Sequence, residues 1–430
     1  MRILIVSTSE QTGGAAVAAR RLLLALNNSG VKAKMLVRDK ETDQLSVVRL
    51  PASFRNAWNF LWERGCLFWY LRFSRRHLFE LDMANAGCDI TALREFKEAD
   101  IIHLNWINQG MLSLKGIRRI LESGKPVVWT MHDVWPATAL CHLTLGCENF
   151  KSACQNCKYL PSGGGVNDLS AEVWRRKQKV LEGQKITFVA CSRWLEGETK
   201  ASALLQGQRI VSIPNPIDTH VFRPSDKQKA REKLGLPADR KLILFVSQRV
   251  TNVNKGMRYL VEACNQLVEE DPELKEKAGV LVLGGHAEEI APLFNLPVFA
   301  LGYVSDAHQI ATVYSASDVF VLPSLSENLP NTIMESMACG VPCVGFEVGG
   351  IPEEIDHLVN GYVARYKDSG DLARGLHWVL VVADYPALSR AAVAKVLSCY
   401  SQDAVAIEYI DIYNKVLSET NPKKWSNSQS

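Results

Sequence analysis

Residues 317–345, SDVFVLPSLSENLPNTIMESMACGVPCVG, decide how the C-terminal half of the chain folds. The apolar run 319–322 predicts a buried strand, and the polar residues that follow it predict a loop. Pro330 favours the first position of a helix, where its missing N–H group costs nothing, and Gly340 favours the end of that helix because glycine readily adopts left-handed backbone angles. The stretch therefore predicts a strand, a loop and a helix in succession.

Two glutamates flank the start of this helix. Glu327 belongs to the loop, because Pro330 keeps it off the helix, whereas Glu335 lies about one and a half turns inside it. Between them, the backbone N–H groups of residues 328–332 lack partners within the helix and point to a place where the helix dipole favours negative charge. Amide donors for an anion, flanked by carboxylates that accept from hydroxyls, suit a nucleotide sugar. A surface loop before an amphipathic helix is the alternative interpretation.

The order of residues through this stretch resembles the donor-site signature of retaining glycosyltransferases with two Rossmann-like domains, the GT-B type, and specifically those like glycosyltransferase family 4. The resemblance implies that Glu327 approaches the transferred sugar and that Glu335 holds the ribose hydroxyls, with Asn328 and Leu329 supplying amide donors between them. Many members of that family have Gly-Phe-Gly where this chain has the segment 328–331, Asn-Leu-Pro-Asn, so the identity of the donor stays open.

The length and composition agree with a two-domain enzyme. A chain of 430 residues that is 47% hydrophobic and 22% charged can form two domains of about 200 residues each. The resemblance implies an α/β fold in which two Rossmann-like domains face a cleft and a C-terminal helix packs back on the N-terminal domain. A Pro-rich connector near Pro214 marks the boundary. We expect an acceptor domain over 1–215, a donor domain over 216–400, a crossover helix over 401–418 and a disordered polar tail over 419–430.

The net charge and the N-terminal sequence bear on the expected partners and the expected location of the protein. A net charge of +3 gives no reason to expect nucleic acid as a partner. The first ten residues, MRILIVSTSE, form a strand pattern without a signal peptide, and no run reaches the roughly 18 apolar residues of a spanning helix. These features predict a cytoplasmic protein, in which the 11 cysteines are thiols or metal ligands more often than disulfides.

Residues 51–80 are rich in aromatic and basic side chains. Aromatic rings and arginines on helical segments suit a bilayer interface, where rings lie among headgroups and arginines meet lipid phosphate. The alternative is a helical insertion packed on the domain, with arginine stems covering apolar surface. The segment therefore predicts either a peripheral membrane contact or a packed insertion. Its defining residues are Trp58, Trp62, Trp69, Tyr70, five phenylalanines, Arg55, Arg64, Arg72, Arg75 and Arg76.

The N-terminal half offers weaker signals. Gly14 closes a glycine pair in the turn between the first strand and an Ala- and Leu-rich helix, where a phosphate could approach the backbone; a plain tight turn is the alternative. His132 follows a strand predicted over 127–130, and Trp106 follows one predicted over 99–104. By resemblance, Gly14 lies beside the donor phosphates and the acceptor, and His132 reaches hydroxyls of the donor sugar. A structural role is the alternative for this histidine.

Four cysteines fall within 17 residues, in the segment 141–161, CHLTLGCENFKSACQNCKYLP. Thiolates so close together, closing in C-x-x-C, can form a structural zinc site, and a metal would order this polar loop. Two disulfides are the alternative, and His142 could replace one thiol. The predicted ligands are Cys141, Cys147, Cys154 and Cys157. The Lys-rich helix expected over 172–183 should present a solvated face.

In the second domain, Arg249 and Lys255 flank a turn between a strand predicted over 241–246 and a helix predicted over 257–270. Two exposed bases on a loop are the alternative. By resemblance this pair holds the donor diphosphate, with arginine as a fork of N–H donors and lysine as a point charge that together offset the charge of the leaving group. Residues 301–304 read as a short strand, and by resemblance the backbone at Val304 meets the nucleotide base.

These expectations amount to a retaining glycosyltransferase that moves a sugar from a UDP- or GDP-sugar to a saccharide or lipid-linked acceptor in cell-surface polysaccharide biosynthesis. Arg249, Lys255, Glu327 and His132 are the expected catalytic residues. No catalytic metal is expected, because cationic side chains meet the leaving group instead. Two alternatives remain: a nucleotide-sugar epimerase or hydrolase on the same fold, which needs no acceptor, and a non-catalytic sugar-nucleotide sensor.

Overall fold

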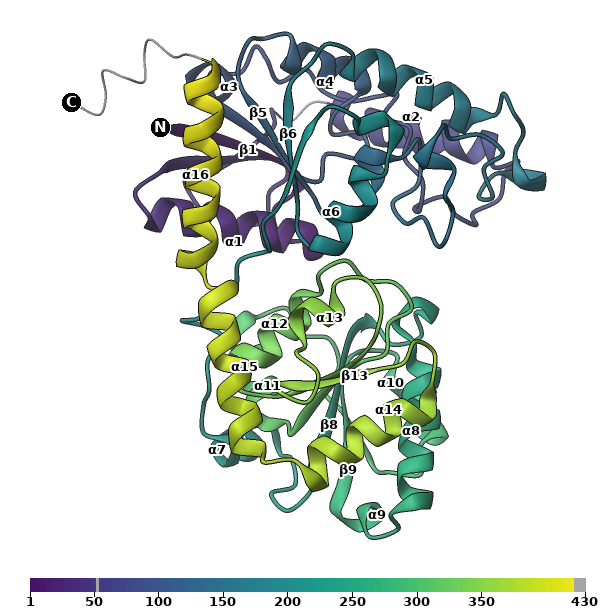
Figure 1. Ribbon diagram of the computed structural model, residues 1–430, viewed down its shortest axis with the longest axis vertical. Helices are drawn as coiled ribbons and strands as arrows, with labels where there is room; N and C mark the ends of the chain where they lie inside the picture. Colours follow the sequence, from purple (N-terminus) through teal and green to yellow (C-terminus); the bar gives the residue numbers. More distant parts are fainter. Residues whose placement is uncertain (52–53, 421–430) are drawn as a thin grey trace. The chain divides into compact units, whose positions relative to one another are not determined.

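The computed structural model of the chain describes residues 1–51 and 54–420. The chain divides into two compact units, of which unit 1 comprises Met1–Pro216 and the chain from Val405 onward, and unit 2 comprises Ile217–Ala404 (Figure 1). Each unit contains one parallel sheet covered by helices. The prediction of two Rossmann-like α/β domains is thereby confirmed.

The sheet of unit 1 has seven strands in the order β3-β2-β1-β4-β5-β6-β7, and every neighbouring pair is parallel. The strand order reverses between β1 and β4, and ligands of such sheets bind outside the carboxyl ends of the strands at that point. The strands are β1 (Arg2–Ser9), β2 (Lys32–Asp39), β3 (Val47–Arg49), β4 (Ile101–Leu104), β5 (Val127–Met131), β6 (Ile186–Ala190) and β7 (Arg209–Ser212).

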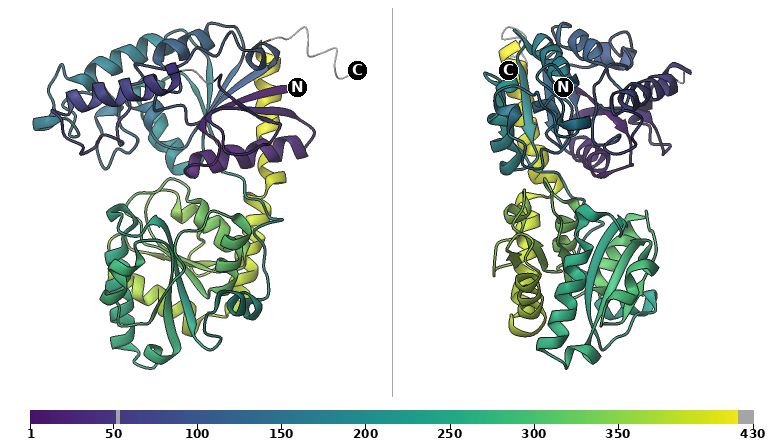
Figure 2. Two further views of the ribbon diagram at one scale, coloured as in Figure 1. Left: turned by 180° about the vertical axis from the view of Figure 1, so that it is seen from behind. Right: turned by 90° about the vertical axis from the view of Figure 1, so that its right-hand side faces the viewer.

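The two faces of this sheet are covered by different helices (Figure 2). Val128 of β5 packs in one core cluster with α1 (Gly14–Asn28) and α16 (Gln402–Thr420). The next residue, Trp129, points to the other face, where it meets α4 (Leu114–Leu121) and α5 (Leu169–Leu181). Burial on both faces explains why the strand reads as a continuous apolar run. The other elements of unit 1 are α2 (Phe54–Tyr70), α3 (Arg94–Glu98), α6 (Arg193–Lys200), η1 (Trp135–Ala137), η2 (Asn149–Lys151), η3 (Pro161–Gly163) and η4 (Ala203–Leu205).

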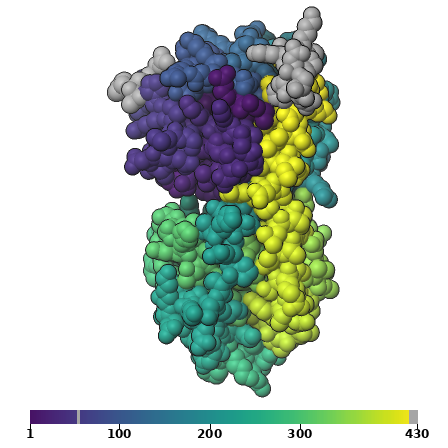
Figure 3. Space-filling model, turned by 90° about the vertical axis from the view of Figure 1, so that its left-hand side faces the viewer, coloured from purple at the N-terminus to yellow at the C-terminus, as the bar shows by residue number. Residues whose placement is uncertain are grey.

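The helix α16 is part of unit 1 although it lies at the end of the chain. His103 of β4 binds the hydroxyl of Tyr413 through Nδ1 at 2.6 Å and that of Thr130 through Nε2 at 2.7 Å. Thr130 also contacts the Tyr409 hydroxyl at 2.9 Å. Burial lowers the pKa of His103 to about 3, so the imidazole is neutral. Figure 3 shows the helix against the N-terminal residues, which confirms the predicted packing of a C-terminal helix on the first domain.

Unit 2 has a six-stranded parallel sheet in the order β10-β9-β8-β11-β12-β13, and its order reverses between β8 and β11. Its strands are β8 (Lys241–Arg249), β9 (Ala278–Gly285), β10 (Val298–Ala300), β11 (Val319–Leu322), β12 (Cys343–Phe346) and β13 (Gly361–Ala364). Its helical segments are α7 (Lys227–Leu234), η5 (Val253–Lys255), α8 (Met257–Glu270), α9 (Leu274–Lys277), α10 (Ala287–Ile290), η6 (Ala291–Leu293), α11 (Ala307–Ala316), α12 (Asn331–Ala338), α13 (Ile351–Glu354), α14 (Ser369–His377), η7 (Trp378–Val382) and α15 (Tyr385–Cys399).

Two expectations need correction. Residues 301–304 are not a strand; β10 ends at Ala300, because Gly302 takes a φ of 71° that an extended strand does not allow. Pro330 is the residue before α12 rather than its first helical residue. The helix α5 presents the expected solvated face, with Glu172, Arg175 and Lys179 exposed, but Lys177 lies on its buried side. Most of the tail expected over 419–430 lies outside the described residues.

Candidate active site

The predicted residues of unit 2 gather at the carboxyl ends of β8 and β11. Arg249 ends β8 and Lys255 ends η5, just beyond it. The loop that follows β11 carries Glu327 and leads into α12. The sheet order reverses between these two strands, so the residues lie at the edge where parallel sheets bind ligands.

The loops after β8 and β11 are locked together by a glycine. Gly256 has a φ of 69°, and a Cβ atom on it would lie 1.8 Å from the carbonyl oxygen of Pro323. The N–H group of Leu325 donates to the carbonyl of Asn254 at 2.8 Å. Only glycine allows both the left-handed backbone and the close approach of the two chains. The position of Lys255 is therefore fixed relative to the loop after β11.

A second glycine holds the same loop from the side of β12. Gly349 has a φ of 59°, and a Cβ atom there would lie 1.7 Å from the carbonyl oxygen of Glu327. The next N–H group, that of Gly350, donates to the carbonyl of Asn328 at 2.7 Å. The backbone at Glu327 and Asn328 is thus held between two neighbouring loops.

This clamping brings two predicted site residues into contact. Nζ of Lys255 lies 2.5 Å from Oε1 of Glu327, and the Glu327 side chain is 14% exposed against 33% for the lysine. Such a charge-assisted contact is among the stronger hydrogen bonds in proteins. A cation and a carboxylate therefore lie side by side at this edge of the sheet.

The other predicted site residues of unit 2 differ in their burial and in their hydrogen-bond partners. Glu335 is buried on α12, and its Oε2 accepts a hydrogen bond from the Tyr314 hydroxyl at 3.1 Å. Burial and the nearby Glu335 carboxylate raise the pKa of Tyr314 well above its usual value, so it stays a donor. Arg249 is exposed, and its Nε donates to Thr251 at 3.1 Å. Leu329 is buried, whereas Val304 is half-buried in the irregular segment between β10 and α11.

In unit 1, Gly14 is the first residue of α1, after Gly13 with a φ of 93°. His132 follows β5, and its Nε2 lies 3.1 Å from Oδ1 of Asn105, which follows β4. Burial lowers the pKa of His132 to about 4, so this imidazole is neutral and can exchange hydrogen bonds with hydroxyls. Both residues lie at the carboxyl end of the sheet.

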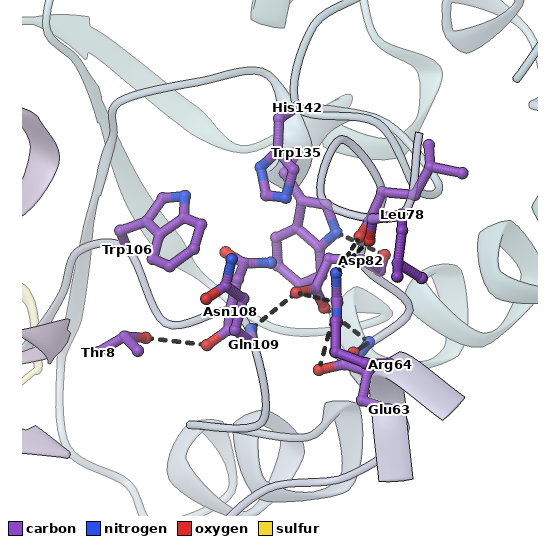
Figure 4. A network of polar contacts seen from close by, with 12 residues as sticks. Thr8, Glu63, Arg64, Leu78, Asp82, Trp106, Asn108, Gln109, Trp135 and His142 are labelled. Atoms are coloured by element: carbon purple, nitrogen blue, oxygen red, sulfur yellow. Dashed lines mark hydrogen bonds and ion pairs between the residues drawn. The ribbon is translucent and has the colours of Figure 1, made fainter. Parts of the chain in front are cut away.

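Trp106, Trp135 and His142 lie in one region of unit 1 (Figure 4), and all three contact Asp133, a link that the sequence did not reveal. Oδ2 of Asp133 accepts a hydrogen bond from Nε1 of Trp106 at 2.9 Å and contacts Nδ1 of His142 at 2.8 Å, while Oδ1 accepts from the N–H group of Trp135 at 2.8 Å. Burial alone would raise the pKa of Asp133, but the adjacent His142 and these donors hold it below its usual value. The anionic carboxylate therefore fixes the indole of Trp106 in place.

Two unused donors lie in the same region. The side-chain nitrogens of Asn105 and Asn108 are buried and have no hydrogen-bond partner among the described residues. The carbonyl of Asn108 accepts from the Thr8 hydroxyl at 2.9 Å, which ties the segment after β4 to the end of β1. Buried polar groups normally have partners, so these two amide nitrogens are donors that a water molecule or a ligand can satisfy.

The four cysteines of the loop lie in one region but not close enough together to share a metal ion. Burial raises the pKa of Cys141 to about 12, and the nearby Cys154, Cys157 and Cys147 raise it further. Yet among the described residues the only group of three or more potential ligands with atoms within 4.8 Å of one another is the exposed set His286, Glu288 and Glu289. The four thiols do not converge as a zinc site requires, and Nδ1 of His142 is engaged by Asp133.

A buried lysine lies next to this loop. Nζ of Lys177 donates to the carbonyls of Trp135 at 2.6 Å and Thr138 at 2.8 Å and lies 3.4 Å from the centre of the Trp135 ring. Burial lowers its pKa to about 7, although Asp82 and Cys154 oppose the shift. The lysine therefore braces the segment that carries Asp133 and Cys141.

Comparisons with known proteins support the two-unit arrangement. Residues 12–221 match the family model described as Glycosyltransferase Family 4, and residues 240–381 match the one described as Glycosyl transferases group 1. D-inositol 3-phosphate glycosyltransferase 2 of Catenulispora acidiphila is 34% identical over 182 residues, which cover 40% of this chain and 42% of that protein. D-inositol 3-phosphate glycosyltransferase of Thermobispora bispora is 29% identical over 255 residues, 56% of this chain and 59% of that one. The chain spans about half the length of these curated relatives.

Solved structures share the fold. Sucrose-phosphate synthase from Thermosynechococcus elongatus superposes with a TM-score of 0.67 at 19% identity, over 97% of this chain and all of the other. The Anabaena protein HepE, solved in complex with UDP, superposes with a TM-score of 0.62 at 16% identity, over 96% of this chain and 100% of that one.

Proposed function

The chain belongs to the retaining glycosyltransferases with two Rossmann-like domains of the family 4 type, and from this premise we propose that it transfers a sugar from a nucleotide-diphosphate sugar to a saccharide or lipid-linked acceptor. The observation that carries the proposal is the contact between Lys255 and Glu327, held between two glycine-locked loops at the start of α12. A cation, a carboxylate and the N–H groups at the start of a helix are what a sugar diphosphate requires.

In this proposal the chain's own residues carry the chemistry. Lys255 and Arg249 bind the diphosphate, and with the N–H groups at the start of α12 they stabilise the negative charge that grows on it as the bond to the sugar breaks. Glu327 binds hydroxyls of the transferred sugar, and Glu335 binds the ribose. The acceptor hydroxyl attacks the face that the diphosphate leaves, which retains the configuration. Asn328, Leu329 and Val304 contact the donor through their backbones.

We assign the acceptor to the carboxyl edge of the unit 1 sheet. Trp106 offers an aromatic face, held by Asp133, and the buried amides of Asn105 and Asn108 offer donors for hydroxyls. His132, neutral and joined to Asn105, supplies a further polar group, and Gly14 borders the region from the start of α1. A sugar or other polyol suits this mixture of ring and amide. A saccharide of a cell-surface polysaccharide is our preferred acceptor.

The donor is a UDP- or GDP-sugar. The complexes of HepE with UDP and UDP-glucose favour UDP, because they belong to a protein of the same fold. A ligand that binds only the folded chain raises its melting temperature, so a panel of UDP- and GDP-sugars identifies the donor. Release of the nucleoside diphosphate with a panel of acceptors, and the anomeric configuration of the product by NMR, then test the transfer.

The same assay distinguishes the alternatives. An epimerase or hydrolase releases nucleotide at full rate without any acceptor, whereas a sensor binds nucleotide sugar and never turns it over. Release that depends on an acceptor supports the proposed function. Glu335→Gln is expected to raise the KM for the donor, because it removes the carboxylate assigned to the ribose.

A further inference from the structure

The helix α2 is anchored to unit 1 by one face. Leu67 and Glu63 are fully buried, and the neighbouring Arg64 is nearly so. Nη1 of Arg64 donates to the carbonyls of Leu78 at 2.6 Å and Leu81 at 3.1 Å, and its Nη2 pairs with Asp82 at 3.2 Å (Figure 4). A buried arginine with three partners fixes the orientation of the helix. The opposite face of α2 is therefore exposed to solvent.

That outward face is apolar. Its large side chains, at positions 58, 61, 62, 69 and 70, lie on one side of the helix, and each is between 43% and 68% exposed. The rings of Trp58 and Trp62 stack with centres 6.3 Å apart. A shallow groove of about 410 Å³ runs between the side chains and over Gly65 and Cys66. We call this surface the tryptophan stripe; its members are Trp58, Leu61, Trp62, Trp69 and Tyr70.

The exposed charges from the stripe through Arg76 are all positive, and the next carboxylate along the chain, Glu80, pairs with His77. Arg72, Arg75 and Arg76 follow the helix directly and are exposed, and the described residues form no ion pair with them. The only acidic residue between positions 56 and 76 is Glu63, which is fully buried. Exposed rings and cations without an exposed carboxylate match the chemistry of an anionic lipid surface, where indoles lie among headgroups and arginines meet phosphates.

We propose that the tryptophan stripe and the three arginines bind the surface of a bilayer that contains anionic lipids. The helix has 17 residues and is about 25 Å long, enough to lie in the headgroup region. No helix in the described part of the chain is long and apolar enough to cross a bilayer. A second copy of the chain is a poorer occupant, because the stripe offers no exposed carboxylate to the arginines. The surface would bring a lipid-linked acceptor, one of the two acceptor classes under the proposed function, to the enzyme.

Flotation of the full chain with vesicles tests the proposal. The chain is expected to bind vesicles of phosphatidylcholine with 30 mol% phosphatidylglycerol at least tenfold more strongly than vesicles of phosphatidylcholine alone. Trp62→Ser with Trp69→Ser should reduce binding to the anionic vesicles at least tenfold, and Arg75→Gln with Arg76→Gln should remove most of the preference for them. The matched control is Val381→Ser with Val382→Ser, exposed apolar residues of unit 2, which should bind as the native chain does.

Other outcomes overturn the proposal. Unchanged binding in the tryptophan variant, or no binding by the native chain, assigns the stripe another role. A native dimer that the tryptophan variant converts to monomers identifies a second copy as the occupant. Nucleotide release with a water-soluble acceptor should be equal in all these variants, so a failure of the membrane proposal is distinguishable from a failure of the proposed function. Circular dichroism confirms that each variant is folded.

Discussion

Nζ of Lys255 and Oε1 of Glu327 lie 2.5 Å apart, although 72 residues separate them in the chain. The lysine follows β8 and the glutamate follows β11, two adjacent strands of the sheet. Each charge keeps the other in place until a ligand arrives. Under the proposed function, a donor sugar takes over both partners: its phosphate replaces the carboxylate beside the lysine, and its hydroxyl replaces the ammonium beside the glutamate.

Lys255→Ala is expected to lower turnover by about 10- to 1000-fold, as the loss of one preorganised electrostatic contact does. Far-UV circular dichroism should be unchanged, because the residue is partly exposed and packs in no core. Lys255→Arg, which keeps the charge, should recover part of the rate. Full turnover by the alanine variant would refute the assignment.

Gly256→Ala should lower the melting temperature and turnover together, because its Cβ atom would meet the Pro323 carbonyl oxygen at 1.8 Å and displace the loop that carries Glu327. The matched control is Gly235→Ala, which has a similar φ of 65° but nothing within 4 Å of the added atom. That control should cost only the backbone strain, about 1 kcal/mol, and leave turnover intact. Equal effects of the two substitutions would mean that the loops are not locked.

Stability should fall as the pH rises toward 9. Burial, followed by the nearby Asp82, raises the pKa of Glu63 from 4.5 to about 9. Between these values the folded chain keeps a proton that the unfolded chain has lost, so each step upward in pH favours unfolding. Glu63→Gln mimics the protonated side chain without titrating, and its melting temperature should depend less on pH between 5.5 and 8.5. Identical profiles for both chains would show that Glu63 is ionised in the fold.

Trp106→Ala is expected to raise the KM for the acceptor at least tenfold while leaving the KM for the donor within twofold, because the indole belongs to the acceptor edge of unit 1. Trp106→Phe keeps an aromatic ring but loses the hydrogen bond to Asp133, so its KM for the acceptor should lie between those of the native chain and the alanine variant. Initial rates at varied acceptor concentration give these constants. A change in the KM for the donor alone would contradict the assignment of Trp106 to the acceptor site.

Metal analysis decides the role of the cysteine loop. The spacing of Cys141, Cys147, Cys154 and Cys157 predicts about one zinc ion per purified chain, and that ion would have to draw together thiols that do not converge in the structure. Replacing Cys154 and Cys157 with serine should then release the ion and lower the melting temperature. A native chain with less than a tenth of an equivalent of zinc would leave the loop without a metal.

Elements with a clear apolar run or apolar periodicity were the ones that the sequence predicted best. The strand expected over 319–322 and the helix expected over 257–270 match β11 and α8 residue for residue, because apolar runs and periodicity directly reflect burial. The false strand over 301–304 arose from ignoring Gly302, whose positive φ ends the extended backbone. Local sequence patterns thus predict helices and strands well, but they fail where a single residue adopts unusual backbone angles, as Gly302 does.

The cluster around Asp133 was beyond such patterns. Its partners Trp106 and His142 come from different segments, and their meeting depends on the register of β4 against β5. A signal was available, since polar residues follow two apolar runs that end at the same sheet edge. Lys177 is a harder case: its burial depends on carbonyls 42 and 39 residues away, at Trp135 and Thr138. Lysine-rich composition alone gives no hint of this.

The docking of α16 has a consequence for how the nascent chain matures. Domains usually fold in the order in which they leave the ribosome. Here the first unit needs Val405, Tyr409 and Tyr413 to cover one side of its sheet, and these residues are translated only after the whole of the second unit. During synthesis the apolar sheet surface around Val128 stays exposed until α16 is made. The first unit is therefore open to chaperones for longer than the second, although it is synthesised first.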